Sequence, residues 1–153
     1  MREKIQSLLE TKKFLFMATS DNNGAPNVAP KFLLKIRRNA IYLIDYAIGK
    51  TWENLIINPR ISLAMIDDNT LTGYRLDGTA QRVDKKAEYD GMLKELQKKE
   101  IHLTATRIIE DIHAGEKSSA FEFAYHAHVA IYKVTVHTIA EIWPSGTVTR
   151  EKA

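Results

Sequence analysis

Residues 40–66 read AIYLIDYAIGKTWENLIINPRISLAMI, and this stretch decides the fold. Its first six and its last six residues are mostly apolar and have the length of a strand. Between them, Gly49-Lys50-Thr51 opens a short helix with Thr51 as its expected N-cap, because a threonine hydroxyl can accept a hydrogen bond from a free backbone N–H group. Asn58-Pro59 ends this helix, since the residue before a proline avoids the helical conformation. The stretch therefore predicts a strand, a short helix and a second strand.

Further strand-length runs lie on both sides of this stretch, separated by residues that favour turns. An amphipathic helix is expected first, over residues 3–11. Pro30, within the second strand, predicts a sheet edge or a bulge because proline lacks the backbone N–H. About six strands with few helices predict an antiparallel barrel, a closure that removes exposed sheet edges. The expected strands are Phe14 to Thr19, Pro26 to Ile36, Ala40 to Asp45, Ile61 to Ile66, Tyr74 to Val83 and Phe121 to His137, with Thr138 to Trp143 closing the sheet.

The segment from about residue 84 to 119 separates the fifth expected strand from the sixth and is predicted to be a helical insert. Residues 85–99 are rich in Lys, Glu and Leu and predict one helix, and Thr106 to His113 predict another. The chain shows no internal repeat and no low-complexity tract. Residues 1–153 are therefore expected to form a single domain that carries this insert.

Composition excludes several classes of function. The absence of cysteine excludes disulfides, thiol nucleophiles, iron–sulfur clusters and Cys-ligated zinc. A balance of 22 basic against 19 acidic residues gives a net charge of +3, which is too mild to indicate a nucleic-acid binder. The apolar runs are too short to cross a bilayer, and the chain begins without an apolar signal region. We therefore expect a cytoplasmic protein with no nucleic-acid and no membrane partner.

The start of the short helix also predicts an anion site. Free backbone N–H groups and the positive end of the helix dipole favour an anion there. Lys50 adds a full positive charge, the Thr51 hydroxyl adds a neutral donor, and Asn54 lies one turn later on the same side. A phosphate group would suit these residues. The alternative is a capped surface helix with a solvated lysine.

Several segments in series resemble the FMN-binding split barrels related to pyridoxamine 5′-phosphate oxidase. The resemblance covers roughly residues 10–83 and 125–146. It implies a mainly β (α+β) fold, a six-stranded antiparallel split β-barrel with flanking helices. The segments that carry it are Pro26 to Ile36, Ile41-Tyr-Leu-Ile-Asp45, Lys50-Thr51-x-x-Asn54-Leu55, Asn58-Pro59-Arg60-Ile61-Ser62-Leu63, Gly78-Thr-Ala-Gln-Arg-Val83 and Ile139-Ala-Glu-Ile-Trp143.

The same resemblance implies a homodimer with FMN at the subunit interface and an oxidoreductase activity on a small molecule or redox partner. By that analogy Lys50 and Thr51 hold the FMN phosphate, and Asn54 supports them. Trp143 approaches the flavin from one of the two subunits. No catalytic residue is assigned. The residues expected along the flavin ring and ribityl chain are Pro30, Lys31, Phe32, Leu43, Ile44 and Asp45.

The chain departs from the oxidase itself in three places. Pro30 lies near the position of an arginine, and Ile48-Gly49 replaces an arginine–serine type pair before the phosphate lysine. Thr147-Val-Thr-Arg150 takes the place of the substrate-binding Arg-Leu-His segment. Oxidation of pyridoxamine phosphate is therefore not the expected reaction.

Two other readings of the barrel stay open. Relatives of this fold are associated with a deazaflavin or with heme, and His126 and His128 share one face of an expected strand. Paired histidines on a strand are more often wall or interface residues, so no metal site is predicted. The barrel could also be a non-enzymatic oligomeric or nucleic-acid-binding module.

Overall fold

The computed structural model describes residues 3–37, 40–46, 48–114 and 129–153, and the side chains of 102–114 are outside this description. The chain divides into two compact units. One contains Met1–Val83 with Val129–Ala153, and the other contains Asp84–His128.

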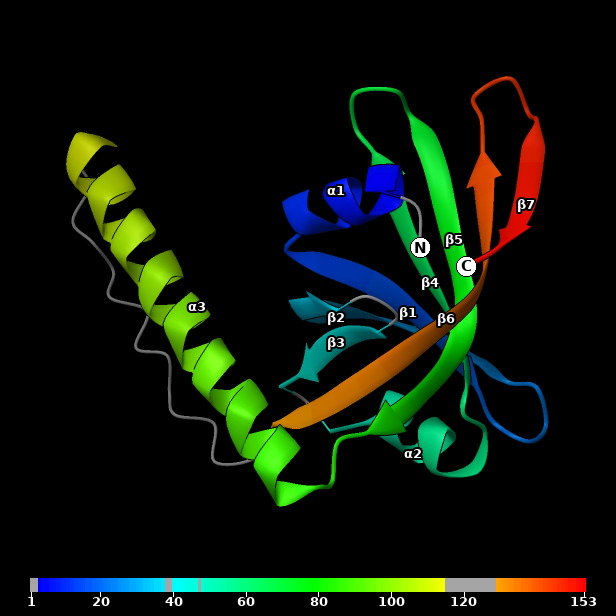
Figure 1. The fold of residues 1–153 in the computed structure, drawn as a ribbon, viewed down its shortest axis with the longest axis horizontal. Coiled ribbons are helices and arrows are strands. Elements are labelled where there is room, and N and C mark those ends of the chain that lie inside the picture. Colours follow the sequence, from blue (N-terminus) through cyan, green and yellow to red (C-terminus); the bar gives the residue numbers. More distant parts are fainter. Residues whose placement is uncertain (1–2, 38–39, 47, 115–128) are drawn as a thin grey trace. The chain divides into compact units, whose positions relative to one another are not determined.

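The first unit is built from strands with two short helices (Figure 1). In chain order its elements are α1 (Glu3–Thr11), β1 (Phe14–Ser20), β2 (Pro26–Arg37), β3 (Ala40–Asp45), α2 (Lys50–Ile57), β4 (Arg60–Asp67), β5 (Thr72–Arg82), β6 (Ala130–Ile142) and β7 (Val148–Lys152). The second unit contains α3 (Lys86–Ala114), which falls within the segment predicted as a helical insert.

All strand pairs in the described part of the chain are antiparallel, in the order β3-β2-β1-β4-β5-β6-β7. β3 also pairs with the first residues of β6, which closes the six strands β1 to β6 into a barrel. β7 pairs with the last residues of β6 and extends the sheet beyond the closure. The predicted six-stranded antiparallel barrel is therefore confirmed.

The barrel interior is filled by alternate residues of the strands, such as Leu15 and Met17 of β1 and Leu63 of β4, which are almost completely buried. Ile5 and Leu9 of α1 join this core. Burial of each such side chain stabilises the fold by about 1.5–3 kcal/mol relative to exposure. α1 and α2 lie at opposite ends of the barrel (Figure 1), and the pocket described below lies at the α2 end.

Pro30 lies at a sheet edge, as predicted. The first half of β2 pairs with β1 alone, because pairing with β3 begins only at Phe32. In this half, one side of the β2 backbone has no neighbouring strand among the described residues. A proline can occupy such a position because its missing N–H breaks no ladder bond. The irregularity of β2 lies further on, between Leu33 and Lys35.

The second half of the chain differs from the sequence prediction in three ways. Residues 86–114 form one helix, where a break had been expected between 99 and 106, because that interval contains no Pro or Gly to end the helix. Residues 121–128 of the strand expected from Phe121 lie outside the described residues; the described strand covers Ala130–Ile142 without the division expected at Thr138. β7 was not predicted; a turn at Trp143–Thr147 returns the chain beside β6.

Replacing Gly78 with alanine is expected to destabilise the protein by about 1–3 kcal/mol, in the range of an overpacked core. Gly78 lies at the register shift between β5 and β6, and a Cβ built there would meet Thr135 O, a backbone atom, at 2.1 Å. Urea unfolding measures the loss. Gly91→Ala is the control, because a Cβ at this helical glycine meets nothing within 4 Å and should be neutral or stabilising. Equal stability of the Gly78 variant and the wild type would contradict this account.

Candidate functional site

A pocket of about 330 Å³ lies where the unpaired half of β2, the end of β3 and the start of α2 meet. These two strands and this helix coincide with three of the segments that carry the family resemblance, namely Pro26 to Ile36, Ile41 to Asp45 and Lys50 to Leu55. The pocket contains all the predicted site residues except Leu43, Asn54 and Trp143. Its lining residues are Asn27, Ala29, Pro30, Lys31, Phe32, Ile44, Asp45, Tyr46, Gly49, Lys50 and Thr51.

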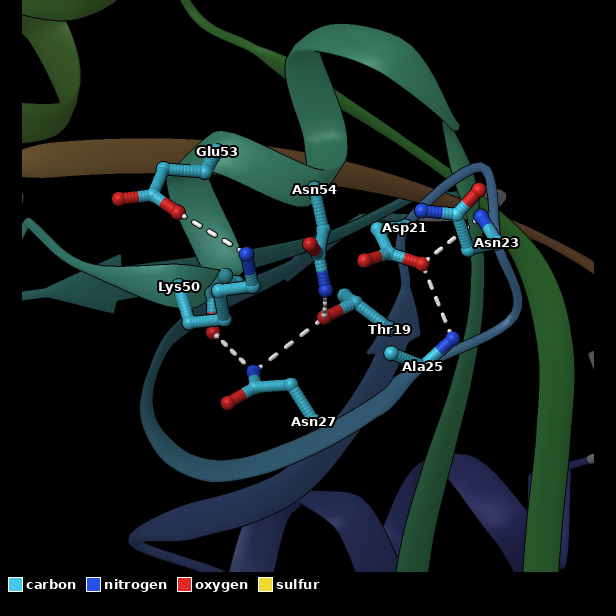
Figure 2. Close-up of polar contacts among 9 residues, drawn as sticks. Thr19, Asp21, Asn23, Ala25, Asn27, Lys50, Glu53 and Asn54 are labelled. Atoms are coloured by element: carbon cyan, nitrogen blue, oxygen red, sulfur yellow. Dashed lines mark hydrogen bonds and ion pairs between the residues drawn. The ribbon is translucent and has the colours of Figure 1, made fainter.

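One wall of the pocket is the N-terminus of α2. The helix begins at Lys50, and its N-cap is Gly49, which makes no side-chain capping hydrogen bond. The backbone N–H groups of the first turn have no partner within a helix, so they remain available to a ligand. The Lys50 ammonium is about half exposed and lies 3.2 Å from Glu53 Oε2, beside this end of the helix (Figure 2).

The prediction of Thr51 as the N-cap is wrong. Thr51 is the second residue of the helix and is only 2% exposed. Its hydroxyl accepts a hydrogen bond from Asn27 Nδ2 at 3.1 Å, so it is engaged by a neighbouring strand and not by the helix backbone. Thr51 therefore contributes a hydroxyl to the pocket wall.

A polar network below α2 fixes the helix to the barrel (Figure 2). Asn54 Nδ2 donates to Thr19 Oγ1 at 3.1 Å, and Asn27 Nδ2 donates to the same oxygen at 3.3 Å. Asn54 is 1% exposed and does not line the pocket. The support for Lys50 and Thr51 that the resemblance implies stays a prediction. The Oδ1 of Asn54 is buried and has no hydrogen-bond partner in the described structure. Asn54 thus anchors α2 to β1, one turn after the start of the helix.

A buried ion pair forms the polar part of the pocket wall. Lys31 Nζ lies 2.7 Å from Asp45 Oδ2, and the two side chains are only 4% and 5% exposed. Burial raises the pKa of the nearby Tyr132 phenol, and the negative charge of Asp45 raises it further. Tyr132 is therefore held neutral beside the pair.

The apolar part of the wall comes from Pro30, Phe32 and Ile44. Phe32 packs edge-to-face on Tyr46, with ring centroids 5.2 Å apart. Leu43 does not reach the pocket, because neighbouring residues of a strand point to opposite faces and Leu43 points into the barrel core. Of the two neighbours Leu43 and Ile44, only Ile44 lines the pocket.

Trp143 lies in a different pocket of about 310 Å³, next to Lys4, Tyr74 and Glu141. Lys4 Nζ lies 5.4 Å from the Trp143 ring centroid and donates to Glu141 Oε1 at 2.8 Å. This hydrogen bond to Glu141 raises the pKa of Lys4, and the one to Tyr74 adds to the effect. Within one chain, the structure does not bring Trp143 to the α2 pocket.

Four lining residues were not predicted from the sequence: Asn27, Ala29, Tyr46 and Gly49. A signal existed for two of them, because Asn27 and Ala29 alternate with Lys31 along one strand and so share its face. From the sequence, Asn27 is placed only within the expected strand Pro26 to Ile36.

The histidine alternative rests on residues outside the described part, since His126 and His128 fall in the segment 115–128. Among the described residues there is no group of three or more His, Asp or Glu side chains that could hold a metal ion. The helices in the described ranges also include none that is long and apolar enough to span a membrane.

The amino-acid sequence is similar to that of another protein. An uncharacterized protein of Methanocaldococcus jannaschii is 28% identical over 99 residues, which cover 63% of this chain and 64% of that protein. The match thus spans less than two thirds of the relative's length.

Solved structures with low identity share the fold. A protein related to general stress protein 26 of B. subtilis, of the pyridoxinephosphate oxidase family from Clostridium acetobutylicum, is 18% identical with a TM-score of 0.69, covering 97% of this chain and 92% of its own. A heme binding protein from Mycobacterium smegmatis is 15% identical with a TM-score of 0.65, covering 98% and 57%. An F420 reductase is 16% identical with a TM-score of 0.59, covering 91% and 98%.

The family itself is shown by the sequence. The family model described as pyridoxamine 5′-phosphate oxidase matches residues 1–132, which is most of the chain. The strand and helix segments that form the α2 pocket all lie within this match. The chain therefore belongs to the pyridoxamine 5′-phosphate oxidase family.

Proposed function

We propose that the chain is an FMN-binding flavoprotein that holds FMN in the α2 pocket and acts as an oxidoreductase on a small molecule or redox partner. The observation that carries this proposal is the composition of the one pocket. A cationic helix N-terminus, a buried ion pair and an apolar wall border the same space. FMN has a phosphate, a polar chain and a flat ring, which match these three parts.

The phosphate is proposed to lie at the N-terminus of α2. Two features support this placement: the first-turn N–H groups have no side-chain cap, and Lys50 stands beside them. The Thr51 hydroxyl supplies a further donor at the same wall. Family membership also supports this placement of the phosphate, because the region that matches the family includes Lys50 and Thr51.

The ring is proposed to lie along β2, against Phe32 and Ile44. The apolar part of the pocket wall suits the aromatic flavin ring. The Lys31–Asp45 ion pair provides fixed charges beside that ring. When bound, FMN supplies the electron-transfer chemistry, and the chain's own residues bind it, orient it and exclude water. No acid or base is assigned among the described residues.

A deazaflavin or heme is the alternative ligand. Two proteins of the same fold are described as an F420 reductase and a heme binding protein. A deazaflavin shares the flat ring system, so the apolar wall alone does not separate it from FMN. The experiment below does, because each chromophore has its own absorption spectrum.

We also propose that the protein is a homodimer. The outer face of β1 and β2 carries Phe14, Phe16, Val28 and Phe32, which are 46%, 48%, 63% and 50% exposed. We call these four residues the apolar patch. Phe14 pairs with Phe32 across the two strands, so the patch is continuous. Because Phe32 also lines the α2 pocket, a second copy seated on the patch would border the ligand.

Purified protein is expected to show a flavin absorption spectrum, alone or after FMN is added. Lys50→Ala should weaken FMN binding about 10- to 100-fold, because a hydrogen bond to a charged group contributes about 1.5–3 kcal/mol. Flavin fluorescence quenching measures the dissociation constant.

Glu53→Gln is the matched control for the charge at this site. It removes the carboxylate that competes for Lys50, so FMN binding should tighten or stay unchanged. A sharp Soret band in place of the flavin bands would transfer the proposal to heme. A protein that has no chromophore and binds no added FMN would remove the flavin proposal altogether.

A further inference from the structure

The side-chain amide of Asn27 lies below α2, close to Thr19 (Figure 2). Its Nδ2 donates to Thr51 Oγ1 at 3.1 Å and to Thr19 Oγ1 at 3.3 Å. Both threonines are buried, with 2% and 5% of their surface exposed. The amide therefore contacts a hydroxyl at the pocket wall.

A hydroxyl has one hydrogen to donate, and it rotates toward the acceptor that is open to it. Thr51 Oγ1 already accepts from Asn27, so its own hydrogen cannot point back to that amide nitrogen. No acceptor for this hydrogen is present among the residues that the structure describes. The remaining direction is the pocket, which Thr51 lines.

We propose that Asn27 is a positioning residue that turns the Thr51 O–H into the pocket, and so makes the start of α2 prefer a phosphate ester over the corresponding alcohol. This inference rests on the proposed binding of FMN in the same pocket. Asn27 acts through Thr51.

The proposed role differs from that of Lys50. The Lys50 ammonium is about half exposed and attracts an anion by charge, with little dependence on direction. The Thr51 hydroxyl is buried and accepts from Asn27, so its hydrogen is turned away from that amide. Thr19 is fixed independently, because Asn54 also donates to it. Loss of the Asn27 amide therefore releases Thr51 while the Asn54 anchor of α2 stays in place.

The experiment compares FMN with riboflavin, which has the same ring without the phosphate. Asn27→Ala should weaken FMN binding about tenfold, as for the loss of one hydrogen bond to a charged group, and leave riboflavin binding within about twofold. Asn23→Ala is the matched control, because Asn23 lies in the adjacent turn and its bond to Asp21 uses the backbone N–H. This control should bind both flavins like the wild type.

A double-mutant cycle tests whether Asn27 acts through Thr51. In a Thr51→Val background, Asn27→Ala should cause no further loss of FMN affinity. If Asn27→Ala does not fold, Asn27→Asp replaces it. The aspartate can only accept a hydrogen bond, so it should turn the Thr51 hydrogen away from the pocket and lower the preference for FMN in the same way.

The outcomes separate the two proposals. A wild-type protein that binds no FMN overturns the proposed function, and this inference with it. A wild-type protein that binds FMN, with an unchanged preference in Asn27→Ala, overturns only the role of Asn27. Equal losses of FMN and riboflavin, or a loss that persists in the Thr51→Val background, also overturn that role because they indicate general damage to the pocket.

Discussion

Replacing Lys31 with methionine is expected to destabilise the protein by about 3–5 kcal/mol, the usual cost of breaking a buried ion pair from one side. The Lys31 side chain is 4% exposed, and its Nζ lies 2.7 Å from Asp45 Oδ2. The methionine side chain has a volume similar to that of lysine and replaces its aliphatic part, so the packing changes little. The cost arises because the buried Asp45 carboxylate loses the Lys31 ammonium.

Urea unfolding measures this loss, and two further variants define its cause. Lys13→Met removes an exposed lysine from the same region of the chain and should change the stability by less than about 0.5 kcal/mol. Asp45→Asn added to Lys31→Met removes the buried carboxylate charge and should restore a large part of the stability. A double variant as unstable as Lys31→Met would show that lost packing, and not the buried charge, is responsible.

The ion pair marks a limit of what the sequence could predict. Lys31 and Asp45 were both expected at the site, but only through the family resemblance, and nothing indicated that they contact each other. They are 14 residues apart, and their approach depends on the register between β2 and β3. An irregularity in that register lies between Leu33 and Lys35, and its place cannot be read from an alternating pattern.

Local patterns predicted the first half of the fold closely. β1 to β5 were anticipated because short apolar runs alternate with strong turn residues, and each signal lies within a few residues of its element. The local pattern gave a wrong prediction for Thr51. Its residue type indicated an N-cap, but its hydroxyl accepts a hydrogen bond from Asn27, which lies 24 residues earlier in the sequence on a neighbouring strand. Contacts between elements decided that position, and one sequence does not contain them in readable form.

Trp143 illustrates a second kind of limit. The resemblance implied that it approaches the flavin, whereas in this chain it lies in the pocket with Lys4 and Tyr74. A residue that reaches a neighbouring subunit cannot be placed at its site from one chain. Its role in ligand binding therefore depends on the proposed dimer.

Replacing Phe16 with glutamate is expected to convert the proposed dimer to a monomer, with the dimer dissociation constant raised at least about 100-fold. Phe16 is the central residue of the apolar patch, between Pro30 on β2 and Ala64 on β4. Truncating a central aromatic residue of an interface costs about 2 kcal/mol or more. Burying a glutamate there adds the desolvation of an unpaired charge.

Sedimentation velocity measures the change, and the thermal unfolding midpoint checks that the monomer is folded. Phe16 is 48% exposed in the single chain, so the fold itself should tolerate the charge. Ile56→Glu is the matched control, because Ile56 is 71% exposed on α2 outside the patch and should leave the dimer intact. Since Phe32 belongs to both the patch and the pocket, the folded monomer should also bind FMN more weakly than the wild type. A wild-type protein that is monomeric, or a Phe16→Glu variant that dimerises normally, would contradict the assignment of this face to a second copy.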